Sequence, residues 1–146
     1  MKRNSLNILL IEDNLGDIRL TKEALKETNL SINLSTVIDG SEAMNYLLKT
    51  KEYENAATPD LIFLDLNLPK KNGREVLKDI KTNAKLQSIP VVVLSTSNAE
   101  KDIQECQQLQ ADQFINKPVD FDEFFKTIKN VIECWFDSPK PTTVSE

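Results

Sequence analysis

With 146 residues, 40% of them hydrophobic and 28% charged, the chain has the size and balance of one globular domain and is too short for two. The net charge is −5 without a block of consecutive Lys or Arg, which argues against sequence-independent binding to DNA or RNA. There is no histidine, which excludes Ser-His-Asp and Cys-His nucleophile systems, histidine-ligated zinc and a phosphohistidine donor.

Five strand-like runs are predicted along the chain, and helix-like stretches separate them. In chain order the runs cover residues 7–11, 32–37, 61–64, 91–94 and 113–115. The first, third and fourth runs contain the continuously apolar segments ILLI, LIFL and VVVL, which are typical of parallel strands that helices cover on both faces. The second run, INLSTV, alternates between apolar and polar residues, so we expect it at or near an edge of the sheet.

The helices between these runs are predicted from their start signals. The first predicted helix is capped by Asp17 and ends near residue 28, and the second opens at Ser41 and ends at residue 48. The third follows the turn Asn72-Gly73 and ends near residue 81. The fourth is capped by Asn98 and ends near residue 109, and the last opens at Asp120. The last helix has an apolar face at helical spacing, made of Phe121, Phe124, Phe125, Ile128, Val131, Ile132 and Trp135. Residues 137–146 are predicted to form a loose tail and not an output domain.

Strict alternation of strands and helices predicts an α/β fold with a doubly wound, five-stranded parallel sheet and right-handed crossovers. Ligands bind such sheets beyond the carboxyl ends of the strands, where the strand order reverses. Chemically capable side chains follow four of the strands: Glu12 and Asp13, then Asp65, Ser95 and Lys117. We therefore expect three acids, a hydroxyl and a lysine at one edge of the sheet.

Such a cluster needs a counter-charge, because two carboxylates about 4 Å apart repel by roughly 4 kcal/mol at an effective dielectric near 20. Mg²⁺ suits a site that offers few carboxylates together with water and a phosphate. Asp65 is then the candidate nucleophile for an aspartyl-phosphate, and Lys117 and the Ser95 hydroxyl are candidates to neutralise the phosphoryl oxygens. Each residue alone has a plainer interpretation, as a helix cap, a turn hydroxyl or a loop lysine before proline. Their joint placement favours the site.

Nothing in the sequence indicates a membrane or secreted protein. The apolar run at residues 8–11 is too short for a signal peptide and leads directly into two acids, and no run is long enough to span a bilayer. A cytoplasmic location is therefore expected. Cys106 and Cys134 have no metal-ligand or redox spacing, so we interpret them as ordinary apolar or surface residues on helices.

Over residues 6–136 the chain resembles the receiver domains of bacterial response regulators. The segments that carry the resemblance are ILLIEDN, PDLIFLDLNLPKKNGREVL, IPVVVLSTS and FINKP. The resemblance implies a (βα)5, flavodoxin-like receiver fold for residues 1–136. It also implies phosphoryl transfer from a histidine kinase to this chain, which catalyses only its own Mg²⁺-dependent phosphorylation and dephosphorylation and is not otherwise an enzyme.

The family's metal and acceptor roles carry over to matching positions. Asp65 is similar to the phosphoacceptor, Asp13 to a direct Mg²⁺ ligand, and Glu12 to an acid that acts on the metal through water. Asn67 stands where the family supplies a backbone carbonyl to the metal. Asn67 and Ser97 flank the expected path of the attacking water, so both are expected to tune the lifetime of the phosphorylated state.

The family's switch residues carry over as well. Ser95 stands at the position of a Ser or Thr whose hydroxyl follows the phosphoryl group, and Lys117 at that of the lysine that pairs with phosphate. The resemblance implies a cis Lys117–Pro118 bond. Phe114 stands at the aromatic switch position. Because Phe has no hydroxyl, a switch there has to work by burial of the ring.

Within this family the chain resembles small single-domain regulators of the cyanobacterial phytochrome type. The segments EDNLGDIRLTKEALKE and INKPVDFDEFFKTIKNVIECWF carry that likeness. It implies a phytochrome-type histidine kinase as partner and a homodimer through the fourth helix, fifth strand and fifth helix. No direct contact with nucleic acid or membrane is expected. Trp135 and Phe136 are candidate interface aromatics, or they simply cover the sheet.

Two other classes of protein remain as alternatives. A haloacid-dehalogenase-type phosphatase also uses an aspartyl nucleophile, but it needs a second Asp two positions later, where this chain has Asn67. Its nucleophile also normally follows the first strand, whereas Asp65 follows the third. A receiver-fold binding module without phosphoryl chemistry is the second alternative, although all the required residues are present.

Overall fold

The computed structural model describes residues 5–96 and 99–136, and within them strands and helices alternate as predicted. The elements are β1 (Leu6–Ile11), α1 (Leu15–Lys26), β2 (Ile32–Val37), α2 (Gly40–Leu48), the short 3-10 helix η1 (Lys51–Tyr53), β3 (Leu61–Asp65), α3 (Gly73–Thr82), β4 (Val91–Ser95), α4 (Glu100–Gln108), β5 (Gln113–Asn116) and α5 (Phe121–Trp135). In each case the predicted strand agrees with the observed one to within a residue at either end.

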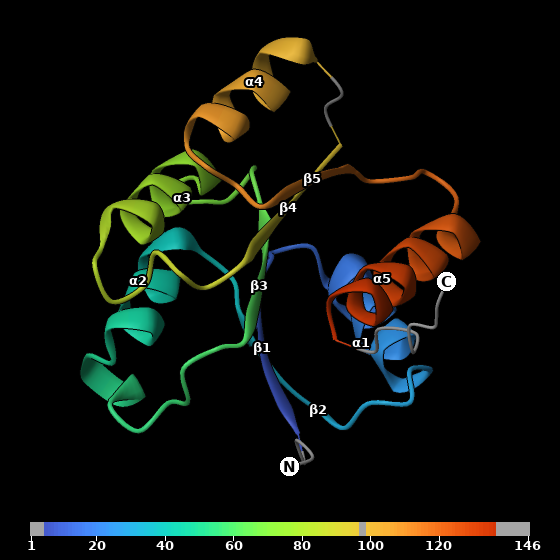
Figure 1. Cartoon of the computed structure of the whole chain (residues 1–146), viewed down its shortest axis with the longest axis horizontal. Helices are drawn as coiled ribbons and strands as arrows, with labels where there is room; N and C mark the ends of the chain where they lie inside the picture. The colour runs from blue at the N-terminus through green and yellow to red at the C-terminus, as the bar shows by residue number, and fades with distance from the viewer. Residues whose placement is uncertain (1–4, 97–98, 137–146) are drawn as a thin grey trace, which may run out of the picture.

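The strands form one parallel sheet in the order β2-β1-β3-β4-β5. Helices α1 and α5 cover one face and α2, α3 and α4 cover the other (Figure 1). This arrangement confirms the doubly wound parallel sheet. It also confirms the edge position of the alternating second run, because β2 is paired only with β1. The strand order reverses between β1 and β3, and there the structure places the loops with the predicted acids.

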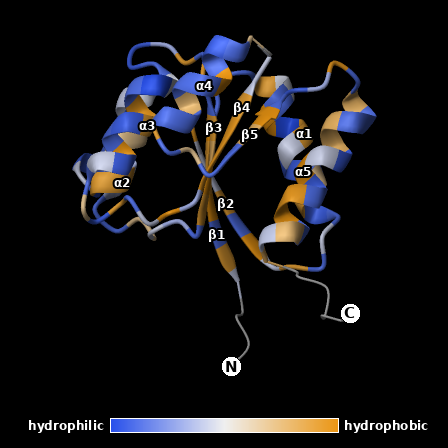
Figure 2. Cartoon of the chain, turned by 45° about the horizontal axis from the view of Figure 1, so that its top comes forward, coloured by the Kyte–Doolittle hydropathy of each residue, from blue (hydrophilic) through white to orange (hydrophobic). Residues whose placement is uncertain are grey.

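Two hydrophobic cores hold the sheet, one on each face (Figure 2). The three continuously apolar strands have side chains in both cores: Ile8 and Leu10 point to the α1–α5 side, and Leu9 and Ile11 to the opposite side. Successive residues of a strand face opposite sides, so a strand covered on both faces has to be apolar throughout. No helix in the described part of the chain is long and apolar enough to cross a membrane.

Two helix starts differ from the prediction. Asn14 caps α1 by accepting a hydrogen bond from the Asp17 amide at 2.9 Å, so the prediction of Asp17 as the cap is wrong. Asp39 caps α2, one residue before Gly40, in place of an opening at Ser41. Both Asn and Asp are good cap residues, so their composition alone does not decide which one takes the position.

The starts of α3 and α5 agree with the prediction. Asn72 forms a reciprocal capping box with Glu75 at the start of α3, and Asp120 caps α5. The predicted cap Asn98 lies outside the described residues, and the position before α4 is occupied by Ala99, without a side-chain cap.

The apolar face of α5 is confirmed in its middle and corrected at its ends. Phe124, Ile128, Val131 and Ile132 are buried against the sheet and α1. Phe121, by contrast, is 72% exposed, because it is the first residue of α5 and lies beyond the end of the packed face. The two cysteines are on helices as expected, Cys106 buried in α4 and Cys134 exposed in α5.

Candidate functional site

The carboxyl edge of the sheet brings the predicted residues together. Glu12 follows β1, Asp65 and Ser95 are the last residues of β3 and β4, and Lys117 follows β5. Strands β1, β3 and β4 are neighbours in the middle of the sheet, so their carboxyl ends open at one place. Four sequence-distant segments thus contribute to a single site.

Three carboxylates form an acidic cluster, made of Glu12, Asp13 and Asp65. One oxygen of each lies within 4.8 Å of the others. Glu12 is completely buried, Asp65 is 5% exposed, and Asp13 is exposed to solvent. Oxygen ligands gathered at a half-open edge suit a hard divalent cation, which would neutralise the cluster and keep water on its open side. The residues present therefore fit the metal that the sequence predicted.

The pKa of Glu12 shows how strongly the cluster needs a counter-charge. Burial raises the pKa of Glu12 from 4.5 to about 8, helped by its hydrogen bond with Asp65 and opposed by the charge of Lys117. Taking a carboxylate out of water disfavours its charged form, and a neighbouring carboxylate adds to that. A divalent cation bound to the cluster would favour the ionised form instead.

The Lys117 ammonium lies among three carboxylates. Its Nζ is 2.8 Å from Asp17 Oδ2, 2.9 Å from Glu12 Oε1 and 3.5 Å from Asp65 Oδ2. Burial by itself lowers the pKa of Lys117, but its hydrogen bond to Asp17 and the charges of Glu12 and Asp65 outweigh burial and raise that pKa above its ordinary value. Lys117 is therefore a fixed positive charge beside Asp65.

The two oxygens of the Asp65 carboxylate have different partners. Oδ1 accepts a hydrogen bond from the Asn67 amide at 3.1 Å, and Oδ2 faces Lys117. Asn67 itself is exposed, at the start of the loop between β3 and α3. Its amide orients the Asp65 carboxylate, a contact that the sequence did not indicate, and the role of its carbonyl toward a metal stays a prediction.

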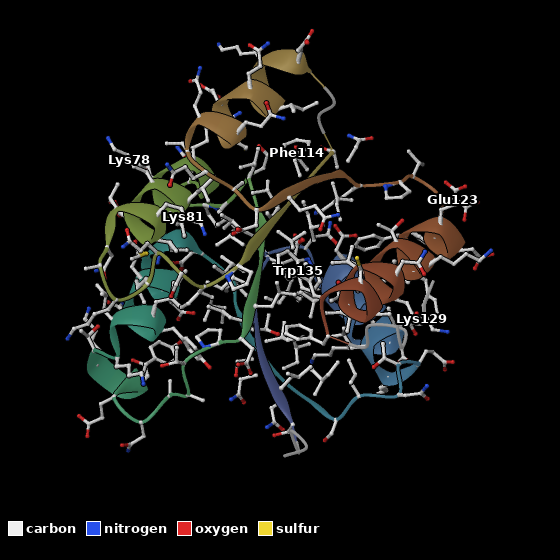
Figure 3. The ribbon with its side chains drawn as sticks, in the orientation of Figure 1. Lys78, Lys81, Phe114, Glu123, Lys129 and Trp135 are labelled. Carbon is white, nitrogen blue, oxygen red and sulfur yellow. The ribbon has the colours of Figure 1, made fainter. Side chains whose placement is uncertain are left out.

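Ser95 and Phe114 lie on the two strands beyond β3. Ser95 is fully buried, and its carbonyl oxygen accepts hydrogen bonds from the Lys117 amide at 2.6 Å and from the Asn116 side chain at 3.3 Å. Phe114 is half-buried on β5, where it packs against the core beneath α2, α3 and α4 (Figure 3). The two residues thus lie on neighbouring strands. Their role as switch residues stays a prediction.

The predicted cis bond between Lys117 and Pro118 is wrong for this structure, in which all peptide bonds of the described residues are trans. The trans form of a bond before proline is favoured by about 0.5–1 kcal/mol unless packing selects the other. Lys117 contacts its three carboxylates with this bond in the trans form. The second predicted lifetime residue, Ser97, lies outside the described residues.

Sequence reasoning missed two residues of the site. Asp17, taken for a helix cap, contacts Lys117 instead. Gly73, taken for part of a turn, packs on the backbone of Asp65 and Leu66. No local signal indicated the contact that Asp17 makes, because Lys117 lies 100 positions away in the sequence. Gly73 gave no signal beyond its residue type.

The candidate interface aromatics lie at the end of α5. Trp135 is 37% exposed, and its Nε1 donates to the Gln113 side chain at the start of β5, at 3.2 Å (Figure 3). Phe136 is half-buried and packs against the core on the α1 side. Trp135 thus joins α5 to the edge strand β5, and it keeps part of its ring exposed to solvent.

The sequence matches the family of response regulator receiver domains over residues 8–129. This chain therefore belongs to that family, and the doubly wound sheet with acids and a lysine at its carboxyl edge is the structure of a receiver domain. The family assignment sets aside the haloacid-dehalogenase-type phosphatase.

Within the family, the chain is similar to the response regulator Rcp1 of Synechocystis sp. (strain ATCC 27184 / PCC 6803 / Kazusa). The two are 43% identical over 131 residues, which cover 90% of this chain and 89% of Rcp1. The crystal structure of the phosphorylated cyanobacterial phytochrome response regulator RcpA matches with a TM-score of 0.88 at 49% identity, covering 90% of this chain and 94% of RcpA. The Mn²⁺-bound form of Rcp1 matches with a TM-score of 0.88 at 42% identity, covering 91% and 96%. The predicted likeness to cyanobacterial phytochrome regulators is confirmed.

Proposed function

We propose that this chain is a response regulator that accepts a phosphoryl group on Asp65 from a histidine kinase and signals by binding another protein. The observation that carries the proposal is the position of the Asp65 carboxylate. Its Oδ2 faces the Lys117 ammonium at 3.5 Å, and the carboxylate belongs to an acidic cluster suited to a divalent cation. Phosphoryl transfer to a carboxylate depends mainly on such positioning and charge neutralisation.

In the transfer, an Asp65 oxygen forms a bond to phosphorus while the bond from phosphorus to the kinase histidine nitrogen breaks, and the imidazole leaves with that electron pair. The Asn67 amide holds Oδ1, so we assign Oδ2 as the attacking atom. Lys117 keeps its proton and pairs with one phosphoryl oxygen, and the Ser95 hydroxyl donates to another. These groups stabilise the charge that spreads over the phosphoryl oxygens during transfer.

Mg²⁺ is the proposed cofactor. Glu12, Asp13 and Asp65, together with the Asn67 carbonyl, are the residues that would hold it. When bound, Mg²⁺ supplies charge neutralisation for the carboxylates and the transferred group. The Mn²⁺-bound form of the similar protein Rcp1 supports a divalent cation as the cofactor.

The phosphorylated state ends by hydrolysis. A water oxygen attacks phosphorus, the Asp65 oxygen leaves with its electron pair, and inorganic phosphate is released. Asn67 and Ser97 flank the proposed path of that water and would set its rate. Because the only substrate turned over is the chain's own aspartyl-phosphate, the protein is not an enzyme in the ordinary sense.

The signal is proposed to pass through Ser95 and Phe114. A phosphoryl group brings roughly −1.5 to −2 charges at neutral pH. Ser95 moves toward it, and the half-buried ring of Phe114 fills the space that Ser95 leaves. The result is a shift between two packings of the face formed by α4, β5 and α5.

The partner kinase is proposed to be of the phytochrome type, with a bilin photoreceptor. The likeness to RcpA, a cyanobacterial phytochrome response regulator, supports this choice. A kinase has to approach Asp65 at the carboxyl edge of the sheet, and three exposed apolar residues stand at the starts of α1 and α5 or just before them: Leu15, Val119 and Phe121. Exposed apolar groups beside a transfer site favour a protein partner there.

We also propose that the chain forms a homodimer through α4, β5 and α5. The edge strand β5 lies between these helices, with Phe114 and Ile115 half-buried and part of Trp135 exposed. Sedimentation with and without beryllofluoride, a phosphoryl mimic, measures the assembly. A monomer at high concentration in both conditions would exclude the dimer.

We also propose a cytoplasmic location, without direct contact to nucleic acid or membrane. The net charge of −5 supports the lack of contact with nucleic acid.

The test of the central proposal is incubation with acetyl phosphate and Mg²⁺, followed by phosphate-affinity electrophoresis. Acetate leaves with the electron pair of its bond to phosphorus as the bond to Asp65 forms. The wild type and the control Asp122→Asn, an exposed acid on α5, are expected to give a slower band. Asp65→Asn is expected to give none. A shifted band that persists in Asp65→Asn would overturn the assignment.

A further inference from the structure

Asp17 differs from the other two carboxylates that contact Lys117, because it does not belong to the acidic cluster. The cluster consists of Glu12, Asp13 and Asp65. Asp17 nevertheless makes the shortest contact with the Lys117 ammonium, at 2.8 Å, compared with 2.9 Å for Glu12 and 3.5 Å for Asp65. One carboxylate is thus engaged with the lysine alone.

The local structure of α1 fixes Asp17 in place. Its amide donates to the Asn14 cap at 2.9 Å, and its carbonyl accepts a hydrogen bond from the Thr21 hydroxyl at 2.8 Å. Both backbone groups are therefore engaged in the first turn of α1, and the carboxylate projects to the sheet edge with 26% of the side chain exposed. The contact with Lys117 joins two segments of the chain that are 100 residues apart.

A divalent cation at the acidic cluster and the Lys117 ammonium would compete for the same carboxylates. A divalent cation at the acidic cluster would draw on oxygens of Glu12 and Asp65, the same two residues that share Lys117 with Asp17. Two cations that need the same carboxylates repel each other, and this repulsion weakens the hold on the lysine. Asp17 is the one of its three partners that a cation at the cluster leaves fully available.

We propose that Asp17 is a positioning residue that holds the Lys117 ammonium beside Asp65 while the acidic cluster binds its cation. The inference rests on the proposed function, since the held ammonium is the group that pairs with the incoming phosphoryl oxygen. Asp17 itself touches no reacting atom. Its effect on transfer passes through Lys117, which stays protonated while the bond to Asp65 forms and the bond to the donor breaks.

The first experiment measures the lysine directly, in protein saturated with Mg²⁺. Amine labelling by reductive methylation, with the modified lysines located by mass spectrometry, compares wild type with Asp17→Asn and with Glu23→Gln. Glu23 is an exposed acid of α1 that contacts Lys26, so it is the matched control. Lys117 is expected to be labelled several-fold faster in Asp17→Asn and unchanged in Glu23→Gln. Equal labelling of Lys117 in all three would overturn the proposal.

The second experiment measures the initial rate of phosphorylation by acetyl phosphate at saturating Mg²⁺. Asp17→Asn is expected to be slower by about tenfold, within the range that misplacing a group at a reacting centre produces. In a Lys117→Met background, Asp17→Asn is expected to have no further effect, because the group it positions is gone. A wild-type rate in Asp17→Asn, or the same loss in both backgrounds, contradicts the inference.

The two proposals fail in different ways. If wild type takes no phosphoryl group at all, the proposed function fails, and the labelling experiment still decides whether Asp17 holds Lys117. If wild type and Asp17→Asn are phosphorylated equally fast, the proposed function stands and the positioning role falls.

Discussion

Gly73 packs directly on the backbone of Asp65. A Cβ atom added at Gly73 would lie 2.5 Å from the Asp65 carbonyl oxygen and 2.5 Å from the Leu66 Cα. The Gly73 amide also donates to the Leu66 carbonyl oxygen at 3.0 Å, so the first residue of α3 is held against the end of β3. The position of Asp65 is therefore fixed in part by a glycine in the next element of the chain.

Gly73→Ala is expected to destabilise the domain and to slow phosphorylation. Both close neighbours are backbone atoms that cannot rotate away, so either α3 or the end of β3 has to shift, at a cost of about 1–3 kcal/mol. Chemical denaturation measures the stability. Lys78→Ala is the control, because Lys78 is an exposed residue of the same helix. Equal stability of Gly73→Ala and wild type would contradict the close approach.

Lys81→Met is expected to destabilise the protein by about 2–3 kcal/mol. The Lys81 side chain is 8% exposed, and its Nζ donates to the Gln87 and Ile89 carbonyls at 3.2 and 3.0 Å and to Asp112 at 2.8 Å. Without the ammonium these acceptors lose their shared donor. Lys78→Met, on the exposed side of the same helix (Figure 3), is the control and should change stability by less than about 0.5 kcal/mol. Equal effects of the two variants in urea unfolding would refute the prediction.

Arg74→Met is expected to loosen α4. Arg74 pairs with Asp102 and with Glu105, the latter at 2.7 Å, and so joins α3 to α4. Within α4 only Cys106 is fully buried, so the helix depends on this pairing more than its neighbours do. Amide hydrogen exchange in α4 should become several-fold faster, while global stability falls by about 1 kcal/mol or less, as for a partly exposed ion pair.

The control for Arg74 is Lys101→Met, at an exposed position of α4. It should leave the exchange rates of the helix unchanged. If Arg74→Met and wild type exchange at the same rate in α4, the pairing with α3 does not hold that helix.

Mg²⁺ is expected to raise the melting temperature of wild type, since a ligand at 100 times its Kd stabilises the folded state by about 2.7 kcal/mol. For a domain of this size that corresponds to a shift of several degrees. Asp13→Asn should lose most of the shift, because Asp13 is exposed and its substitution removes a cluster carboxylate without disturbing the core. Scanning calorimetry with and without Mg²⁺ gives the comparison. A full shift in Asp13→Asn would place the cation elsewhere.

The strands and the site edge were predictable from sequence because their signals are local. Burial on both faces demands apolar residues at every position of a strand, and three runs show that pattern. A parallel sheet then gathers the residues after each strand at one edge, so Glu12, Asp65, Ser95 and Lys117 could be brought together from their sequence positions alone. Family resemblance added their individual roles.

The cap of α1 could not be predicted from local sequence patterns alone. Asn14 and Asp17 are both suitable caps by residue type, and the sequence favoured Asp17. In the structure Asn14 takes the cap, and the Asp17 carboxylate contacts Lys117 instead. The contact of Asp17 joins it to a residue 100 positions away, which no local pattern contains.

The sequence by itself thus determined the fold class and the edge at which the site lies, and it supplied Asp65 as the candidate acceptor. Periodicity and residue type reflect burial and chemistry one element at a time, so they are sufficient for these features. Only the tertiary structure decided that Lys117 is held by Asp17 as well as by Glu12 and Asp65, and that Gly73 packs on Asp65. Such contacts depend on how separate elements pack against each other, and they are fixed only when the whole sheet and its helices have assembled.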